Sequence, residues 1–362
     1  MKLLISGGGT GGHVFPAIAI ANAVRKIEPQ TDILFVGAEG KLEMKKVPEA
    51  GYPIIGLPIR GFQRKLGMDT VKGVFRLIRS LWKSVGIIRS FKPDVVVGVG
   101  GYASGPVLAL AVCFGKPILI QEQNSYPGIT NRMLSRVADK ICVAFEGLEK
   151  YFDRAKMVLT GNPVRQDLCT GLDAGEARRQ LGLDPSKKTI AVLGGSLGAR
   201  SINNALLGIS DVIRTRPDLQ WIWQTGNLYY EEMKSHSIGQ WPHLKMMPFV
   251  DRMDLVYSAS DIVVSRAGAL TLAELAVAGL PSILVPSPNV AEDHQRKNAE
   301  AFRNQGGARM ILDAELANRI WPEIRDLLEK DRERLDMKNA LLRMARPEAA
   351  AHIAKTVIEL SH

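Results

Sequence analysis

ISGGGTGGHVFPAIAIANAVRK, residues 5–26, is the stretch that decides the fold. A short apolar run ends at Ile5, residues 7–12 include five glycines, and small and apolar residues at helical spacing follow. Because glycine has no Cβ, such a loop brings backbone N–H groups and a helix N-terminus close to an anion or a sugar. The stretch therefore predicts a buried strand, a ligand-binding loop and a helix.

The glycine loop has two other interpretations. Gly7, Gly9 and Gly12 match the G-x-G-x-x-G fingerprint of dinucleotide-binding folds, and Glu39 would then be the acid that binds the ribose. This match keeps an NAD(P)-dependent Rossmann oxidoreductase as an alternative function. A turn that needs glycine only for packing is less favoured, because five glycines cost more backbone entropy than such a turn requires.

His13 directly follows the glycines. At the N-terminus of the predicted helix, the positive end of the helix dipole favours a neutral imidazole, which can accept a proton. We therefore predict that His13 is a general base. The alternative is a histidine that only caps the helix or hydrogen-bonds to a carbonyl group.

Short runs rich in β-branched residues alternate with helical patterns along the chain. The runs are KLLIS, DILFVG, PDVVVGVG, KPILIQE and KICVAF, followed by TIAVLGG, LQWIWQTG, DIVVSR and PSILVP. This alternation is typical of parallel sheets covered by helices on both faces. It breaks at about residues 161–175. The sequence thus predicts an α/β protein with two Rossmann-like domains, residues 1–161 and 162–340, and a last helix, about 341–362, that packs back on the first domain.

Length and composition agree with two domains. The chain has 362 residues, 46% of them hydrophobic, and a single core stops growing near ~250 to 300 residues. Cys113, Cys142 and Cys169 are widely spaced, which predicts neither a disulfide framework nor a zinc site and favours a reducing cytoplasm. Residues 95–115 carry no charge, but their glycines and proline predict strand, loop and helix rather than a membrane span.

Two further loops follow predicted strands in the second domain. In TIAVLGGSLGARSINNAL, Gly194–Gly198 separate a strand from a helix, and Ser196 adds a hydroxyl donor for a phosphate. In SRAGALTLAEL, residues 268–271 start a helix and Glu274 lies in its first turn. A carboxylate at that position can accept hydrogen bonds from both hydroxyls of a ribose. Stabilising the helix dipole is its alternative role.

The net charge of +10 is concentrated in one segment. Residues 60–92 contain nine basic residues and one acid, Asp69. An apolar helical stripe in this segment has a basic edge: the stripe is Val71, Phe75, Ile78, Trp82 and Val85, and the edge is Lys72, Arg76, Arg79 and Lys83. The pattern predicts docking on an anionic membrane leaflet. A crossover helix that buries part of the stripe is the alternative, and nucleic acid is less favoured because aromatics are not interleaved with the charges.

Eight motifs occur in the order found in the MurG family of bacterial transferases, glycosyltransferase family 28, and the chain resembles this family over essentially its whole length. The motifs are GGGTGGHVFPA, GVGGYASGP, QEQNSYPGITNR, GNPVR, GGSLGAR, SRAGALTLAEL, AGLPSILVP and DHQRKNA. The resemblance implies a GT-B fold, in which two Rossmann-like domains with parallel sheets face each other across a cleft.

The resemblance also implies an activity. Members transfer N-acetylglucosamine (GlcNAc), with inversion, from UDP-GlcNAc to the C4 hydroxyl of N-acetylmuramic acid (MurNAc). The acceptor is undecaprenyl-pyrophosphoryl-MurNAc-pentapeptide (lipid I), and the product is lipid II, the precursor of peptidoglycan. An oxocarbenium-like transition state is expected for such a transfer.

Individual residues acquire roles through the same resemblance. His13 would take the proton of the acceptor hydroxyl. The residues that would bind UDP-GlcNAc are Thr10, Gly11, Gly12, Asn124, Arg165, Ser196, Val250, Ala269, Leu270, Thr271, Leu272, Ala273, Glu274 and Gln295, with Asn298 a weaker addition.

The donor-binding residues divide by the part of the donor they approach. In the family, the first glycine loop and Asn124 approach the sugar, and Gln295 faces its hydroxyls. Arg165 and Ser196 belong to the diphosphate site. Val250 holds the uracil by its backbone, and the segment 269–274 lines phosphate and ribose.

A metal site is not predicted. No Asp-x-Asp motif occurs, and the Glu-Asp-His run at residues 292–294 lacks a partner cluster. We expect no required cofactor, with stimulation by divalent ions left open. The expected partners are UDP-GlcNAc, lipid I and the anionic cytoplasmic face of the bacterial inner membrane, to which the protein would bind peripherally, and the resemblance leaves room for cell-wall synthesis proteins.

Overall fold

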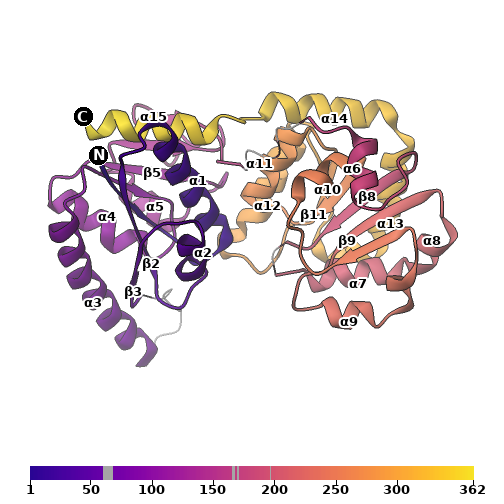
Figure 1. Ribbon diagram of the computed structural model, residues 1–362, viewed down its shortest axis with the longest axis horizontal. Helices are drawn as coiled ribbons and strands as arrows, with labels where there is room; N and C mark the ends of the chain where they lie inside the picture. Colours follow the sequence, from indigo (N-terminus) through magenta and orange to yellow (C-terminus); the bar gives the residue numbers. More distant parts are fainter. Residues whose placement is uncertain (60–67, 165–167, 169–170, 196) are drawn as a thin grey trace. The chain divides into compact units, whose positions relative to one another are not determined.

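The structure is a computed structural model that describes residues 1–59, 68–164, 168, 171–195 and 197–362. It divides into two compact units (Figure 1). The N-terminal unit comprises Met1–Val164 and Glu348–His362, and the C-terminal unit comprises Arg165–Pro347. Each unit contains one parallel sheet with helices, which confirms the predicted α/β class.

The N-terminal unit is built on a seven-stranded parallel sheet in the order β3-β2-β1-β4-β5-β6-β7. The strands are β1 (Lys2–Ser6), β2 (Asp32–Ala38), β3 (Ile54–Leu57), β4 (Val95–Gly98), β5 (Ile118–Glu122), β6 (Lys140–Val143) and β7 (Met157–Leu159). The helices are α1 (Gly11–Ile27), α2 (Glu43–Glu49), α3 (Met68–Phe91), α4 (Ser104–Cys113), α5 (Ile129–Leu134) and α15 (Ala349–Ser361).

Alternate residues of the central strand β1 serve two separate cores. Leu3 and Ile5 belong to the core that includes Ile20 of α1 and Ile353 of α15. Leu4 belongs to the opposite core, to which α3, α4 and α5 contribute side chains. Because side chains alternate along a strand, the sheet is covered on both faces. The last helix of the chain, α15, thus packs in the same core as the first helix, α1.

The C-terminal unit has a six-stranded parallel sheet in the order β10-β9-β8-β11-β12-β13. The strands are β8 (Lys188–Leu193), β9 (Leu219–Gln224), β10 (Leu244–Met247), β11 (Ile262–Ser265), β12 (Ser282–Leu284) and β13 (Arg309–Met310). The α-helices are α6 (Ala174–Gln180), α7 (Arg200–Gly208), α8 (Ser210–Thr215), α9 (Tyr230–Lys234), α10 (Met253–Ala259), α11 (Ala269–Ala278), α12 (His294–Asn304), α13 (Leu316–Glu329) and α14 (Asp331–Met344). Short 3-10 helices span Ser237–Gln240 (η2), Ala291–Asp293 (η3) and Asp313–Glu315 (η4).

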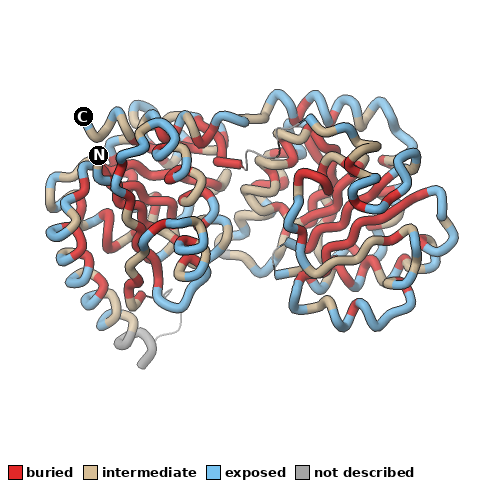
Figure 2. Tube along the Cα trace, viewed as in Figure 1, coloured by how far each residue is buried: buried red, intermediate tan, exposed pale blue. Residues whose placement is uncertain are grey.

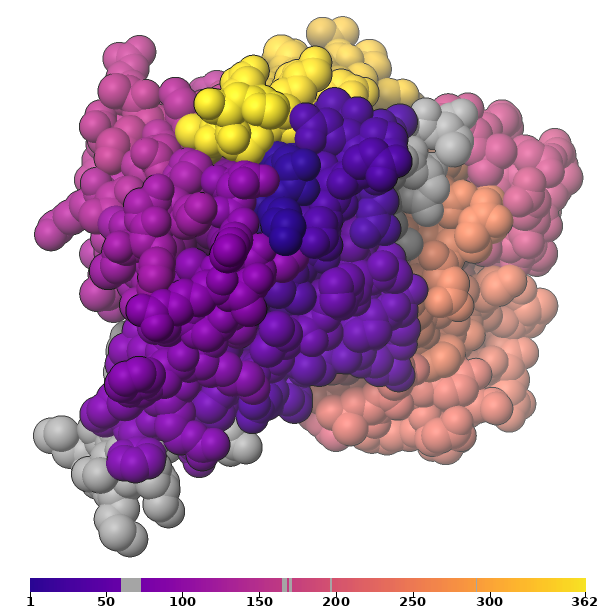
Figure 3. Space-filling model, turned by 60° about the vertical axis from the view of Figure 1, so that its left-hand side comes forward, coloured from indigo at the N-terminus to yellow at the C-terminus, as the bar shows by residue number. Residues whose placement is uncertain are grey.

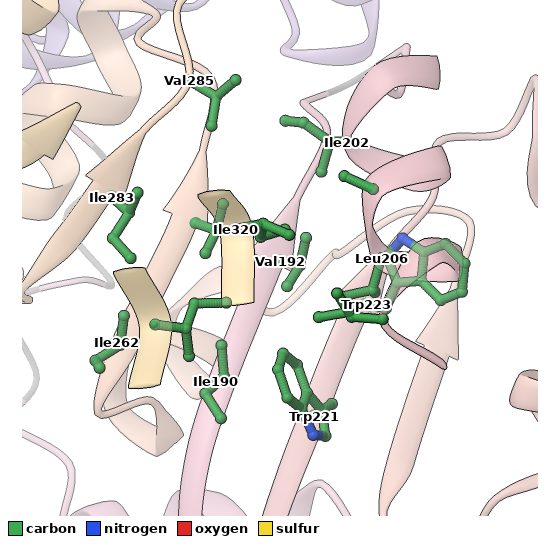
Figure 4. Close-up of a cluster of buried hydrophobic side chains, with 14 of the residues drawn as sticks. Ile190, Val192, Ile202, Leu206, Trp221, Trp223, Ile262, Ile283, Val285 and Ile320 are labelled. Carbon is green, nitrogen blue, oxygen red and sulfur yellow. The ribbon is translucent and has the colours of Figure 1, made fainter. Parts of the chain in front are cut away.

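Two fully buried tryptophans, Trp221 and Trp223, occupy the core on one face of this sheet (Figure 4). They lie on β9 and pack with Leu206 of α7 and Ile320 of α13 in one hydrophobic cluster. Figure 2 shows that buried residues follow the strands of both sheets, whereas the covering helices alternate between buried and exposed positions. Each sheet therefore forms a rigid base for the loops at its strand ends.

The nine predicted runs all form strands, and residues 95–115 form β4, a loop and α4 as expected. The four strands that the sequence does not reveal are β3, β7, β10 and β13, which are the edge strands of the two sheets. Within the described ranges, no helix is both long and apolar enough to span a membrane.

Candidate active site

The predicted site residues of both units follow the carboxyl ends of parallel strands. In the N-terminal unit, the first glycine loop follows β1 and Asn124 follows β5. In the C-terminal unit, Gly194 follows β8, Val250 lies after β10, and the loop before Ala269 follows β11. Open α/β sheets bind their ligands at this edge.

The first glycine loop uses its early amides within the protein. The amides of Gly7 and Gly8 donate to backbone carbonyls at 3.2 and 3.3 Å. The amide of Gly9 donates to Glu43 Oε2 at 2.9 Å. The following residues, Gly11–Gly12, lie in the first turn of α1, where N–H groups have no intrahelical acceptor. The start of α1, rather than residues 7–9, is therefore the part of the loop suited to donate to a ligand.

His13 lies in the first turn of α1 and is partly buried. Its Nδ1 atom is 3.3 Å from Thr10 Oγ1. The other edge of the ring faces Gly100, where an added Cβ would lie 3.0 Å from His13 Nε2 and 3.6 Å from Asn131 Nδ2. Gly100 has a φ of +90°, a backbone conformation that favours glycine. The imidazole thus packs between Thr10 and the loop after β4.

Glu122 organises the loop that carries Asn124. Its Oε1 accepts the backbone N–H and the side-chain amide of Asn124, at 2.9 and 3.2 Å. Its Oε2 accepts from Asn131 Nδ2 at 2.8 Å and from the Gly128 amide at 3.2 Å. Burial raises the pKa of the Glu122 carboxyl, and these N–H donors oppose that effect. Asn124 and Asn131 are therefore both held by one buried carboxylate.

The second glycine loop is tightly folded between β8 and α7. The Gly194 amide donates to a backbone carbonyl of β9 at 3.3 Å, and the Gly198 amide donates to the Gly195 carbonyl at 2.9 Å. A Cβ on Gly198 would lie 2.2 Å from the Thr225 carbonyl oxygen, so only glycine allows this approach of the backbones. Ser196, the hydroxyl donor predicted for this loop, lies outside the described residues.

The third loop begins α11, and its N-cap Gly268 has an extended conformation. Leu272, near the start of the helix, is fully buried and packs in the core. The first turn of α11 contains no acidic residue, so Glu274 lies one turn later than the sequence predicted. The hydroxyl of Tyr257, which is 4% exposed, donates to Glu274 Oε2 at 3.1 Å. A buried donor therefore orients the carboxylate that is predicted to bind the ribose.

Arg266, which sequence reasoning did not single out, connects several parts of this edge. Its guanidinium is within hydrogen-bonding distance of Asp313 Oδ1 at 2.5 Å, Ser201 Oγ at 2.8 Å and the Val285 carbonyl at 3.1 Å. The side chain is 15% exposed. Arg266 therefore holds the loop after β11 against α7 and the end of β12. Its place inside the motif SRAGALTLAEL was the available signal.

Two other residues that are predicted to bind the donor, Gln295 and Val250, lie on the same edge of the sheet. Gln295 Oε1 accepts the Ser287 amide at 2.9 Å, which holds the first turn of α12 against the loop after β12. Glu292 and Asp293, just before α12, have φ values of 56° and 54°, which are costly for residues other than glycine. Val250 is buried, at 3% exposed.

The remaining predicted residues are either structural or not described. Asn298 of α12 is fully buried and donates to the Ala267 carbonyl at 3.5 Å. This hydrogen bond joins α12 to the third loop. Arg165, like Ser196, lies outside the described residues. In the part of the chain that is described, no group of three or more His, Cys, Asp or Glu residues has a metal-binding arrangement.

The predicted membrane patch lies on α3, and its central aromatic residues face solvent. Phe75 is 69% exposed and Trp82 is 74% exposed, and Ile78 is also exposed. Ile87 and Ile88, by contrast, are buried in the core. The crossover-helix alternative thus accounts for a different face of α3. Figure 3 shows the purple surface of this helix facing outward.

The basic edge of α3 is described in part. Arg79 and Lys83 are exposed and Arg76 is partly exposed, while Val85 is partly buried. Lys83 pairs with Glu39 at 3.3 Å. The side chains of the first predicted members, residues 71–72, lie outside the described part of the chain.

Comparison with known proteins identifies the family. The glycosyltransferase family 28 N-terminal domain matches residues 3–143, and the C-terminal domain of the same family matches residues 189–356. The chain belongs to glycosyltransferase family 28. It is therefore a glycosyltransferase, as the resemblance predicted. The N-terminal match lies within the N-terminal unit, and the C-terminal match covers most of the C-terminal unit and extends into α15.

Relatives of known name cover the whole chain. UDP-N-acetylglucosamine--N-acetylmuramyl-(pentapeptide) pyrophosphoryl-undecaprenol N-acetylglucosamine transferase of Bacteroides fragilis is 49% identical over 100% of this chain and 96% of its own length. The protein of the same name from Flavobacterium psychrophilum is 50% identical over 99% of this chain and 97% of its own length. The crystal structure of Acinetobacter baumannii MurG is 27% identical, with a TM-score of 0.77 and 99% of each chain covered.

Membership of family 28 argues against the alternative function, an NAD(P)-dependent oxidoreductase. The structure supplies two physical reasons that agree with this assignment. The Gly9 amide, which a dinucleotide phosphate would need, is taken by Glu43. Glu39, the acid proposed for the ribose of a dinucleotide, is exposed and paired with Lys83.

Proposed function

We propose that this family 28 chain transfers GlcNAc from UDP-GlcNAc to the C4 hydroxyl of MurNAc in lipid I, forming lipid II with a β-1,4 linkage. The observation that carries the proposal is the 49% identity to the Bacteroides fragilis transferase over the full length of this chain. The geometry of the two strand edges supports it, because each edge offers the groups that one substrate needs.

His13 is the proposed general base. Its Nδ1 atom lies 3.3 Å from Thr10 Oγ1, and the neutral imidazole is the group proposed to accept the proton of the acceptor hydroxyl. As the C4 oxygen of the acceptor forms a bond to the anomeric carbon, the bond from that carbon to the UDP oxygen breaks. The hydroxyl proton passes to His13, and the attack from the opposite side inverts the α-linked donor.

UDP-GlcNAc is proposed to bind mainly on the C-terminal unit. The amides in the first turn of α11, with the helix dipole, suit the departing diphosphate, so the proposal includes no resident metal. Glu274, oriented by Tyr257, accepts the ribose hydroxyls. Gln295, whose Oε1 is held by a backbone amide, turns its side-chain NH₂ group to the sugar.

The polyprenyl chain of lipid I places the acceptor at a membrane surface, and the exposed stripe on α3 suits that surface. Phe75, Ile78 and Trp82 supply apolar area, and Arg79 and Lys83 supply cations beside it. Amphipathic helices of this composition bind anionic interfaces. We therefore propose peripheral binding at the cytoplasmic face of the bacterial inner membrane.

The experiment that tests the function measures UDP release and glycosylated product with a short-chain lipid-linked acceptor and a panel of UDP-sugars. UDP-GlcNAc is expected to be the preferred donor, with release that depends on the acceptor. Product formation that is equal with another UDP-sugar, or none with lipid I, would overturn the proposal.

His13→Ala tests the base in the same assay. We expect kcat to fall roughly 10²- to 10⁴-fold, because proton transfer to a positioned base contributes about that much. UDP binding should be retained, since the donor lies mainly on the other unit. His352→Ala is the matched control, because His352 is exposed on α15 of the same unit. A His13→Ala enzyme with full turnover would remove the proposed base.

A further inference from the structure

Glu43 is a buried carboxylate beneath the first glycine loop. It is the first residue of α2 and is 1% exposed. Its two oxygens accept hydrogen bonds from two separate segments: Oε1 accepts the Ala38 amide and Oε2 accepts the Gly9 amide, both at 2.9 Å. The carboxylate therefore joins the end of β2 to the glycine loop.

Glycines on both segments make room for this carboxylate. A Cβ on Gly8 would lie 2.2 Å from Glu43 Oε1, and a Cβ on Gly37 would lie 2.4 Å from Glu43 Cγ. Gly8 and Gly9 also have φ values of +147° and +93°. The glycine content of the loop is thus explained in part by a protein carboxylate that it encloses, rather than by a bound anion.

The position of Glu43 bears on the two residues that follow the loop. The Gly9 amide that it holds is adjacent to Thr10, the N-cap of α1, and Thr10 Oγ1 contacts His13. Without this hydrogen bond, the backbone conformation of the loop at Gly9 would be costly, and the loop would be released. The residues at the start of α1 would then no longer be held in one position. Hydrogen bonds to a charged group are among the stronger ones in proteins, so this anchor is substantial.

We propose that Glu43 is a positioning residue for the transfer reaction, one that holds the first glycine loop in the shape that places Thr10 and His13 against the acceptor. The inference rests on the proposed function of the site. Glu43 touches neither substrate in this scheme, and it acts through the Gly9 amide.

The test compares three variants. Glu43→Gln keeps the size of the side chain but replaces one acceptor oxygen by an NH₂ group, so one of the two amides loses its partner. Gly37→Ala displaces Glu43 from the β2 side and leaves the glycine loop unchanged in sequence. Glu39→Gln is the matched control, because Glu39 lies four residues earlier, is exposed and pairs with Lys83 on the surface.

Two measurements are made on each full-length variant. Steady-state kinetics gives kcat and the KM for UDP-GlcNAc, and hydrogen exchange with mass spectrometry follows the peptide that contains residues 7–13. For Glu43→Gln and Gly37→Ala we expect kcat to fall roughly 10- to 100-fold, a loss typical of a displaced reactive group. The KM for UDP-GlcNAc should change less than about twofold, and the loop peptide should exchange faster. Glu39→Gln should match the wild type in both measurements.

The outcomes separate this inference from the function on which it rests. An unchanged kcat together with unchanged exchange in both Glu43→Gln and Gly37→Ala would overturn the positioning role. So would a loss of UDP affinity as large as the loss of kcat, because Glu43 would then serve the donor site or general stability. If the wild-type protein fails to glycosylate lipid I, the proposed function fails, whereas the exchange data still report whether Glu43 holds the loop.

Discussion

Replacing both Phe75 and Trp82 with serine is expected to weaken binding to anionic vesicles by roughly a few hundredfold. The two side chains are 69% and 74% exposed on α3, and a fully exposed Phe and Trp together offer roughly 400 Å² of surface. If about half of their exposed area enters the interface, the loss is about 3.5 kcal/mol at ~25 cal/mol per Å². The serine side chains would contribute almost none of this binding free energy.

The assay is co-sedimentation with vesicles of phosphatidylcholine containing an anionic phospholipid, at low and high salt. Wild-type binding should weaken at high salt, because the cations beside the stripe interact with the surface through a screened potential. The matched control replaces Leu335 and Leu342, which are 50% and 48% exposed on α14 of the C-terminal unit. Equal vesicle binding by the wild type and the Phe75/Trp82 double variant would refute docking through α3.

Two further predictions concern single side chains. Tyr257→Phe removes the hydroxyl that donates to Glu274, so the KM for UDP-GlcNAc should rise about 5- to 20-fold in steady-state kinetics, the equivalent of about 1 to 2 kcal/mol. An unchanged KM would contradict the assignment of Glu274 to the ribose. Burial raises the pKa of the Cys142 thiol to about 12 from 9.0, so at pH 8.5 a thiol reagent should label exposed Cys113 and leave Cys142 intact, as peptide mapping will show. Because the thiol of the unfolded chain ionises at lower pH than the buried thiol, the contribution of Cys142 to the free energy of unfolding should be lost as pH rises from 9 toward 12. Denaturation of a Cys142→Ala variant should not show this part of the pH dependence.

The central strands of both sheets could be predicted from the sequence because they are buried on both faces. A strand such as β4, with four buried residues, appears as an uninterrupted apolar run. The edge strands β3, β7, β10 and β13 carry partly exposed residues or are very short. Half-buried edges need fewer apolar residues, so hydrophobic patterning alone does not reveal them.

The candidate site was predictable where glycine or a helix start marks it and unpredictable where a side chain acts through tertiary contacts. His13 and Glu274 follow directly from loop-to-helix patterns. Glu43 has no local motif: its importance arises because the parallel pairing of β1 and β2 brings the loop after one strand beside the helix after the other. Tyr257 and Arg266 likewise act across elements that are adjacent only in the folded chain.

The chemistry of Glu43 also explains why two similar glycine loops can serve different substrates. In the second loop, the described amides donate to neutral carbonyls such as that of Gly195, so this loop adds no negative charge of its own. In the first loop, a carboxylate holds the Gly9 amide. Glu43 thus occupies the Gly9 amide, which an anion could otherwise approach, and the part of the first loop left for a substrate is the start of α1, where Gly11 and Gly12 lie. Under the proposed function, this part of the loop serves the acceptor and the sugar of the donor beside His13, whereas the diphosphate binds at the helix starts of the C-terminal unit.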